Sequence, residues 1–317
     1  MTAELPKTMK AAVVDSAGPP EIIHIRDVPV PRLTHNHVII ALEYASVGIW
    51  DAKQRAGEWG SVEPGTILGA DGSGTVAAVA SDVENVRVGT RVYSFSYGNR
   101  QGFHAQYVSV RAERVAPVPN QIQPVIAGAM ACVALTALPG LETLKVRSGQ
   151  TLLVFGASGG IGSFAAWLGS GMGATIIGTA RPDAQDYVRK LGAAHAIDLH
   201  SSEREAVIKR TAPDGFDAAL VAANSNDLPA FLAHLRPRAR FAYPNGVEPE
   251  PRAEGHDGVA FDAEMSHEAF ERLNAAIGSR TIPLRTEVFA LNDVVAAHRR
   301  IEKGHVIGKI VLRVAKP

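Results

Sequence analysis

Residues 151–162 read Thr-Leu-Leu-Val-Phe-Gly-Ala-Ser-Gly-Gly-Ile-Gly. The first five residues favour a strand that is buried on both faces of a parallel sheet. Glycines at 156, 159, 160 and 162 follow at once, and they allow backbone amides to approach an anion at the start of a helix. Apolar residues at 161, 164, 165 and 168 have helical spacing, so a helix is expected directly after the turn.

The segments that follow extend this pattern. Residues 174–179 predict a second strand, and residues 182–191 predict a second helix that Gly192 ends. Strands are expected at 194–198, 217–221 and 240–243, with helices at 203–210 and 227–235 between them. The alternation indicates an α/β fold with a doubly wound parallel Rossmann sheet. Its glycine turn is expected to bind a dinucleotide, although ordinary strand-to-helix turns can look the same; the residues expected to contact the phosphates are Gly156, Ser158, Gly159, Gly160 and Ile161.

The rest of the chain predicts a second domain. Short strands at 10–15, 37–46, 74–80 and 91–95 are separated by glycine and proline turns, which is typical of a barrel-like all-β unit. Small apolar residues at 125–144 predict a pair of packed helices. After residue 283 we expect a strand at 287–290, a helix capped by Asn292 and a strand at 308–314 that completes the β unit. The predicted domains are residues 1–122 with 283–317, and residues 123–282.

Composition limits the possible functions. The 317 residues carry 32 basic and 32 acidic side chains, so no general electrostatic attraction to nucleic acid or to an anionic membrane is expected. A single cysteine, Cys132, excludes an intrachain disulfide and a site of several thiolates, and it is expected to be a small buried hydrophobe. No apolar run of membrane-spanning length and no secretory signal are expected, which favours a cytoplasmic protein.

Several motifs carry a family resemblance. The glycine turn, the β unit and the closing segments 297–299 (Ala-His-Arg) and 308–312 (Gly-Lys-Ile-Val-Leu) resemble the medium-chain dehydrogenase/reductase superfamily, and most of all its zinc-free NADPH:quinone oxidoreductase branch. Trp167 departs from the pattern, where the family usually has glutamine. The resemblance implies a GroES-like β-barrel as the first domain and a homodimer formed through an edge strand at 258–261. It also implies that the cofactor contacts Thr136, Ala222, Asn245 and Lys309.

The same resemblance bears on metal binding. Zinc-dependent members take ligands from a cysteine and a histidine at the positions that are Gly48 and Ala70 here. Neither residue has a side chain that can donate to a metal, and a catalytic zinc needs about three protein ligands. We therefore expect no metal.

The end of the second strand indicates the cofactor. Enzymes that prefer NAD place an acidic residue there to bind the ribose hydroxyls, whereas this chain has Thr179, Ala180 and Arg181. The guanidinium of Arg181 can offer a planar fork of donors to a 2′-phosphate. NADPH is the expected cofactor; a solvated surface arginine is the alternative.

Trp50 and Asp51 are the candidate catalytic residues. Asp51 is the candidate proton donor, with a structural turn-capping role as the alternative and water as another proton source. The branch often has asparagine at Gly48 and tyrosine at Lys53, so its mechanism is not simply carried over. An acceptor pocket is expected to include Trp50, and each aromatic in it has core packing as its alternative; the expected walls are Ile49, Trp50, Tyr93, Phe95 and Tyr97.

Three functions are compatible with these features. The first is an NADPH-dependent quinone reductase that acts on a small-molecule acceptor, and the second is reduction of the activated double bond of an enone or enal on the same scaffold. The third is a dinucleotide-binding protein with a structural or regulatory role. Two further residues have simpler interpretations: His104 is expected to be a hydrogen-bonded loop histidine, and Tyr187 is expected to lie in the core.

Overall fold

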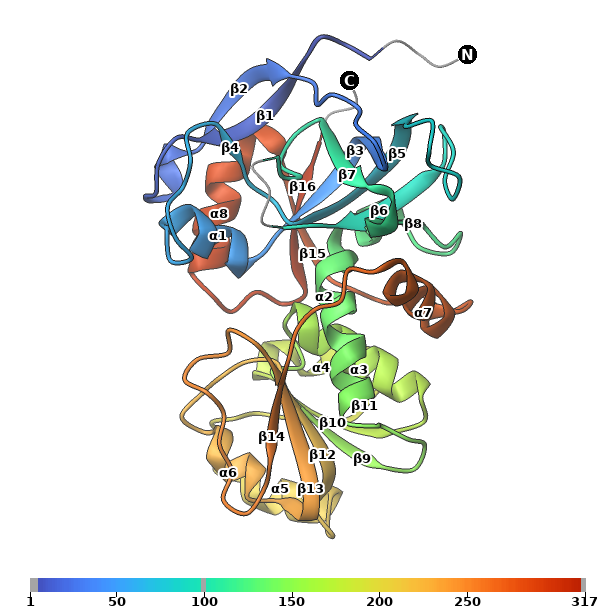
Figure 1. Ribbon diagram of the computed structural model, residues 1–317. Helices are drawn as coiled ribbons and strands as arrows, with labels where there is room; N and C mark the ends of the chain where they lie inside the picture. Colours follow the sequence, from blue (N-terminus) through green and yellow to red (C-terminus); the bar gives the residue numbers. More distant parts are fainter. Residues whose placement is uncertain (1–4, 98–100, 315–317) are drawn as a thin grey trace. The chain divides into compact units, whose positions relative to one another are not determined.

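The computed structural model describes residues 5–97 and 101–314, and the chain divides into two compact units (Figure 1). Unit 1 comprises Met1–Cys132, Met265–Asn274 and Arg285–Pro317, and unit 2 comprises Val133–Glu264 and Ala275–Leu284. The chain passes from unit 1 to unit 2 inside helix α2 (Pro124–Thr143). The domain boundaries given by the sequence remain a prediction.

Unit 2 contains the parallel sheet that the sequence predicts. Its six strands lie side by side (Figure 1), and every neighbouring pair is parallel. In sheet order they are β11 (Ala193–Ile197), β10 (Thr175–Thr179), β9 (Thr151–Phe155), β12 (Phe216–Val221), β13 (Leu235–Pro244) and β14 (Gly258–Phe261). The connecting helices are α3 (Gly160–Gly171), α4 (Gln185–Lys190), α5 (Arg204–Thr211) and α6 (Leu228–Leu232). β14 is an edge strand as expected, and the homodimer remains a prediction.

Unit 1 contains the β unit, and the end of the chain completes it. β16 (Lys309–Arg313) pairs antiparallel with β3 (His37–Val47) and parallel with β15 (Thr286–Ala290). The predicted return of the chain end to the first domain is therefore confirmed. The other strands of this sheet are β5 (Asp71–Val79), β6 (Arg91–Phe95), β8 (Val115–Pro117) and β7 (Tyr107–Arg111), and a smaller sheet contains β2 (His24–Pro29), β1 (Thr8–Val14) and β4 (Thr66–Ile67).

Each unit has its own hydrophobic core. In unit 2, Leu153, Phe155 and Phe231 belong to one buried cluster, and the rings of Phe155 and Phe231 meet edge to face with centroids 5.5 Å apart. In unit 1, apolar residues of β3 such as Val38 and Ile40 pack in a cluster with residues of β16. Burying a side chain of this size contributes roughly 2 kcal/mol. The central strands β9 and β10 of unit 2 are buried along nearly their whole length, as expected for a parallel sheet covered on both faces.

Helix α2 corrects one expectation. The sequence predicts a pair of helices at 125–144, but the structure has one helix of 20 residues with Pro139 inside it. Proline lacks an amide hydrogen, so the carbonyl four residues earlier loses its helical donor. Here that carbonyl, of Leu135, accepts a hydrogen bond from the amide of Glu264 at 3.1 Å. The amide of Glu264, which is distant in sequence, thus replaces the helical donor that Pro139 cannot supply.

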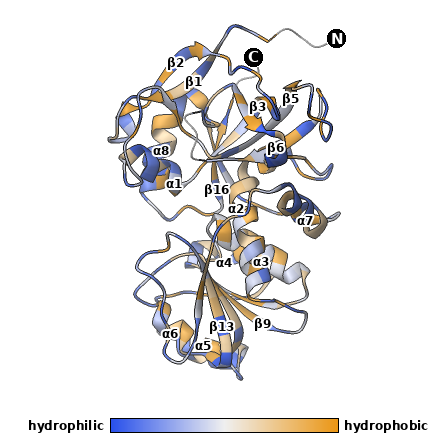
Figure 2. Cartoon of the chain, viewed as in Figure 1, coloured by the Kyte–Doolittle hydropathy of each residue, from blue (hydrophilic) through white to orange (hydrophobic). Residues whose placement is uncertain are grey.

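The sequence predicts no apolar run long enough to span a membrane, and helix α2 corrects this expectation. Pro124–Thr143 is long and apolar enough to cross a membrane by length and composition, and it is hydrophobic along its length in Figure 2. However, 89% of its most apolar window is buried inside the protein. It is the buried core helix of a soluble protein, and the compartment remains a prediction.

Other helices differ from the sequence-based expectations. α1 (Ile49–Ala56) and α7 (His267–Ile277) were not predicted. α8 (Val294–Glu302) has Asp293 at its N-cap, without a side-chain hydrogen bond, so the predicted cap at Asn292 is wrong. A 3-10 turn at Leu291–Asp293 precedes α8 and shifts the start of the helix. Further 3-10 turns lie at Pro20–Ile22, Ala112–Arg114 and Pro182–Ala184.

We predict that Gly162→Ala destabilises unit 2 by about 3 kcal/mol, because the new methyl group would overlap the backbone carbonyl of Gly156. Gly159→Ala is the matched control, since a methyl group there meets no atom closer than 3.6 Å; it should cost about 1 kcal/mol or less. Calorimetric unfolding of both variants measures the difference. Equal destabilisation would show that the close approach of the turn to α3 does not matter.

Candidate functional site

The glycine turn between β9 and α3 has the geometry of an anion site. Gly156 has a φ of 82°, which side-chain-bearing residues rarely adopt. Its amide donates to the hydroxyl of Thr179 at 2.8 Å, which ties the turn to the end of β10. Helix α3 then begins at Gly160, and the first amides of a helix have no partner within the helix. The turn thus directs free amides and the positive end of a helix dipole toward one place.

Arg181 lies where the sequence predicts it, directly after β10. Its side chain is 42% exposed, and its Nη2 lies 3.2 Å from a carboxylate oxygen of Asp183. An exposed ion pair of this kind contributes little to stability. The guanidinium is therefore accessible to a ligand phosphate, and its contact with a cofactor remains a prediction.

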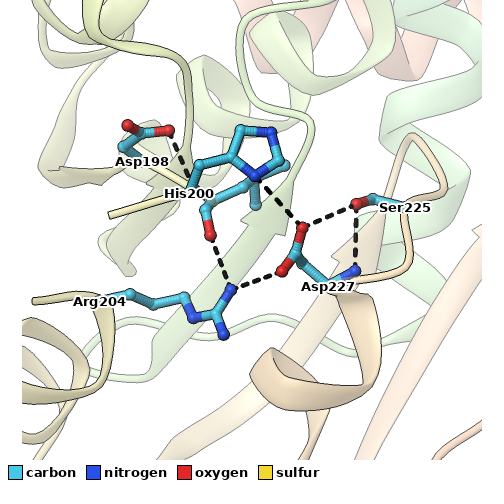
Figure 3. Close-up of polar contacts among 6 residues, drawn as sticks. Asp198, His200, Arg204, Ser225 and Asp227 are labelled. Atoms are coloured by element: carbon cyan, nitrogen blue, oxygen red, sulfur yellow. Dashed lines mark hydrogen bonds and ion pairs between the residues drawn. The ribbon is translucent and has the colours of Figure 1, made fainter. Parts of the chain in front are cut away.

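Two loops at the carboxyl edge of the sheet are joined by a polar cluster (Figure 3). Arg204 lies at the start of α5. Its Nη1 donates to the carbonyl oxygen of Leu199 and to Oδ1 of Asp227, each at 2.7 Å. The Ser225 hydroxyl accepts from the Asp227 amide at 3.1 Å, and Nδ1 of His200 lies 3.6 Å from Asp227 Oδ2. The hydrogen bond from Arg204 lowers the pKa of Asp227. The cluster fixes the loops after β11 and β12 relative to each other.

The remaining predicted cofactor residues fall in different places. Ala222 follows β12, and its amide donates to the carbonyl of Phe155 at 2.9 Å. The side-chain amide of Asn245 donates to Asp262 at 2.8 Å. Thr136 is a buried residue of α2 in unit 2, whereas Lys309 belongs to unit 1. The roles of these residues toward a cofactor remain predictions.

In unit 1, Asp51 is fully enclosed. It lies in the first turn of α1, is 1% exposed, and its Oδ2 accepts a hydrogen bond from the amide of Gly48 at 2.7 Å. The other oxygen, Oδ1, is buried as well. Burial raises the pKa of Asp51 to about 7, although the Gly48 hydrogen bond opposes the rise. Asp51 is thus both a helix-capping residue and a carboxyl group that can hold a proton near neutral pH.

A second buried carboxylate lies near Asp51. Asp71, the first residue of β5, accepts hydrogen bonds from the Ser46 hydroxyl and from the amide of Cys132 at 3.0 Å. Burial raises the pKa of Asp71, and its negative charge helps to raise that of Asp51. The charge of Lys309 acts in the opposite direction on both carboxyl groups. The Lys309 ammonium lies 4.7 Å from the centre of the Trp50 ring, a cation–π contact.

The predicted acceptor pocket is only partly supported. Tyr93 and Phe95 are 0% and 1% exposed, so the alternative of core packing is the correct one for both. Tyr93 donates its hydroxyl to Asn274 at 2.8 Å within unit 1. Ile49 and Tyr97 are exposed, and Trp50 is partly buried, with its ring nitrogen lacking a partner.

Sequence reasoning missed part of this buried network. Ser46, Asp71 and His104 were not proposed as site residues, and all three are buried. His104 has one hydrogen-bond partner: Nε2 donates to the Ser46 carbonyl at 2.8 Å, whereas Nδ1 has no partner. The expected satisfied loop histidine is therefore only half satisfied. The available signal was a polar residue inside an apolar strand, as with Ser46 in β3. Cys132 and Tyr187 are buried as expected.

Within residues 5–97 and 101–314, no group of three or more His, Cys, Asp or Glu side chains could hold a metal ion. Gly48 precedes α1 and Ala70 precedes β5, beside the two buried carboxylates. Metal independence remains a prediction.

Comparison with known proteins identifies the class. The alcohol dehydrogenase GroES-like domain matches residues 34–120, and a zinc-binding dehydrogenase family matches residues 191–312. The NADPH-dependent alkenal/one oxidoreductase of Arabidopsis thaliana is 26% identical, with 98% of this chain and 81% of that protein covered. Alcohol dehydrogenase 2 of Caenorhabditis elegans is also 26% identical, but the match spans 62% of this chain and 63% of that protein.

Solved structures agree with this class. The quinone oxidoreductase from Coxiella burnetii superposes with a TM-score of 0.84 at 25% identity, over 98% of this chain and 100% of that one. The two family matches cover more than half of the sequence between them; the first lies in unit 1, and the second includes segments of both units. The chain therefore belongs to the medium-chain dehydrogenase/reductase superfamily, a class of NAD(P)H-dependent oxidoreductases.

We predict that Asp227→Asn loosens the cluster of Figure 3, because the amide keeps the shape but loses the ion pair with Arg204. A loss of about 1 kcal/mol should raise amide hydrogen exchange about fivefold in residues 198–204 and 222–227. Asp186→Asn, which removes an exposed ion pair with Arg189 on α4, is the control and should leave these loops unchanged. Unaltered exchange in Asp227→Asn would mean that the ion pair does not hold the loops.

Proposed function

We propose that the protein is an NADPH-dependent reductase that transfers a hydride to a quinone-type acceptor without a metal. The observation that carries this proposal is the enclosed carboxyl group of Asp51, whose pKa of about 7 lets it hold a proton at neutral pH. It lies beside Gly48, where zinc-dependent relatives would need a ligand. A proton donor at this place can assist a reduction that a metal would otherwise promote.

Unit 2 has the features needed to bind the cofactor. The glycines at 156, 159, 160 and 162 keep the turn close to the start of α3, since a methyl group on Gly162 would overlap the Gly156 carbonyl. The amides at the start of α3 would hold the pyrophosphate, and Arg181 would hold the 2′-phosphate. No carboxylate stands at Thr179, Ala180 or Arg181 to favour NADH. When bound, NADPH supplies the hydride.

The residues of unit 1 supply the proton, and they set the affinity of Asp51 for that proton. Transfer of one hydride to a quinone leaves the hydroquinone monoanion, with a negative charge on oxygen, and one proton is needed to complete the hydroquinone. The protonated carboxyl of Asp51 gives this proton, becomes a carboxylate, and regains a proton from solvent. Asp71 raises the pKa of Asp51 and Lys309 lowers it, so the two charges together set the proton affinity of Asp51.

Reduction of an activated carbon–carbon double bond is the second candidate. The match to the Arabidopsis alkenal/one oxidoreductase over 98% of this chain favours it. The same hydride and the same proton would then be added to the two carbons of an enone. Turnover of a panel of quinones and enones with NADPH distinguishes the two, and binding of NADPH without oxidation by any of them would point to a structural or regulatory role.

We predict that Arg181→Ala raises the KM for NADPH about tenfold and changes the KM for NADH less than twofold, because only NADPH carries the 2′-phosphate. Arg189→Ala is the matched control, as Arg189 also forms an exposed ion pair with a nearby aspartate on the same segment. Steady-state kinetics with both cofactors give the ratio. If both KM values rise together, Arg181 does not bind the 2′-phosphate.

We predict that Asp51→Asn lowers kcat about a hundredfold, because the amide accepts the Gly48 hydrogen bond but has no proton to give. Wild-type activity should be constant below pH 7 and fall above it, because an acid with a raised pKa loses its proton as the pH rises through about 7. The variant should show no such fall.

The control for this variant is Asp15→Asn, which replaces an exposed carboxylate of unit 1 that is bonded to Arg26. It should leave both kcat and the pH profile unchanged. Full turnover by Asp51→Asn would assign the proton to water.

A further inference from the structure

Three buried polar side chains from distant parts of the chain meet in unit 1, and a fourth, Glu302, reaches them from the surface. Arg55 lies in the last turn of α1, His298 and Glu302 come from α8, and His104 precedes β7. The two histidines are 0% exposed and Arg55 is 1% exposed. Arg55 forms an ion pair with Glu302, and the rings of His104 and His298 meet edge to face with centroids 5.6 Å apart.

These side chains have polar atoms that no protein group satisfies. Nε and Nη1 of Arg55, Nδ1 of His104 and both ring nitrogens of His298 are buried without a hydrogen-bond partner. Each such atom gives up the hydrogen bonds that it makes to water in the unfolded chain. Buried polar atoms are nearly always bonded to protein or to ordered water. Several unpaired nitrogens in one place therefore indicate a bound molecule.

The chemistry of the site selects water over an anion. Glu302 already neutralises Arg55. Burial lowers the pKa of His104 to about 4 and that of His298 well below its usual range, so both rings are neutral at pH 7. Because Nε2 of His104 faces the Ser46 carbonyl, it carries the hydrogen, and Nδ1 is left as an acceptor. Water can donate to this acceptor while it accepts from Arg55, whereas an anion can only accept.

We propose that Arg55, His104 and His298 enclose ordered water molecules, and that this hydrated site positions Ser46 and Asp71 next to Asp51. The contacts follow one another: the ring of His104 donates to the Ser46 carbonyl, and the Ser46 hydroxyl donates to Asp71. Asp71 in turn raises the pKa of Asp51. His298 is thus a positioning residue that acts through water and His104. This role rests on the proposed function, but the water site does not.

The water site is tested on the wild-type protein without turnover. With histidine labelled by 15N and 13C, NMR should show long-lived water next to the His104 and His298 rings, and the nitrogen shifts should report neutral rings with His104 protonated at Nε2. No water at either ring would overturn the proposal. Ring shifts that follow added chloride or phosphate would overturn it too, because they would show an anion in the site.

The positioning role is tested by His298→Phe and His298→Gln. Phenylalanine cannot bind water, so the water signal at His104 should disappear. Loosening of Ser46 should raise the pKa of Asp71, which reduces its charge and lowers the midpoint of the kcat–pH profile by about half a pH unit or more. Glutamine keeps a donor and an acceptor and should restore both readouts.

His35→Phe is the control, since His35 is an exposed histidine of unit 1 that lies outside the buried cluster. It should change neither readout. A His298→Phe profile equal to that of the wild type would overturn the positioning role. If the wild type shows the water but reduces no quinone or enone, the proposed function fails and the water site stands. If His298→Phe does not fold, the NMR test of the wild type and the His298→Gln comparison still decide the matter.

Discussion

The pairing of β16 with β3 is the interaction on which the candidate site in unit 1 depends. The register places Val311 opposite Ser46 and Ile310 opposite Val47. Lys309 is therefore brought beside residues that are more than 230 positions earlier in the sequence, where its charge acts on Asp51 and Asp71. The same return of the chain packs α8 against α1 and brings Glu302 to Arg55. Without this pairing, the buried carboxylates would lack their neighbouring cation.

A balance of burial and charge gives Asp51 its chemistry. Enclosure alone favours the neutral acid, and a second carboxylate nearby strengthens the effect. The ammonium of Lys309 and the amide of Gly48 limit it, so that the pKa stays near 7. A group in this range can both hold and release a proton under ordinary conditions. Burying the carboxyl groups of Asp51 and Asp71 lowers the free energy of unfolding of unit 1, which favours a functional role for them over packing alone.

In unit 2 the candidate site is formed mainly by backbone geometry. A methyl group on Gly162 would overlap the Gly156 carbonyl, so the turn lies close to the start of α3, and the hydroxyl of Thr179 accepts a hydrogen bond from the amide of Gly156. The loops at the same edge of the sheet are fixed by charged side chains, as in the Arg204–Asp227 pair. A ligand that contacts several loops binds more tightly when those loops are already ordered, because less conformational entropy is lost.

The sequence by itself determined the elements that depend on local pattern: the strand, turn and helix at 151–171, the alternation of strands and helices that indicates a parallel sheet, and the final strand at residue 309 onward. These follow from hydrophobic periodicity and glycine placement, which are properties of neighbouring residues. Only the tertiary structure decided the single helix through Pro139, because the amide that satisfies Leu135 belongs to Glu264. It also decided which polar residues are buried together, since the network of Ser46, Asp71 and His104 depends on contacts between segments that are distant in sequence.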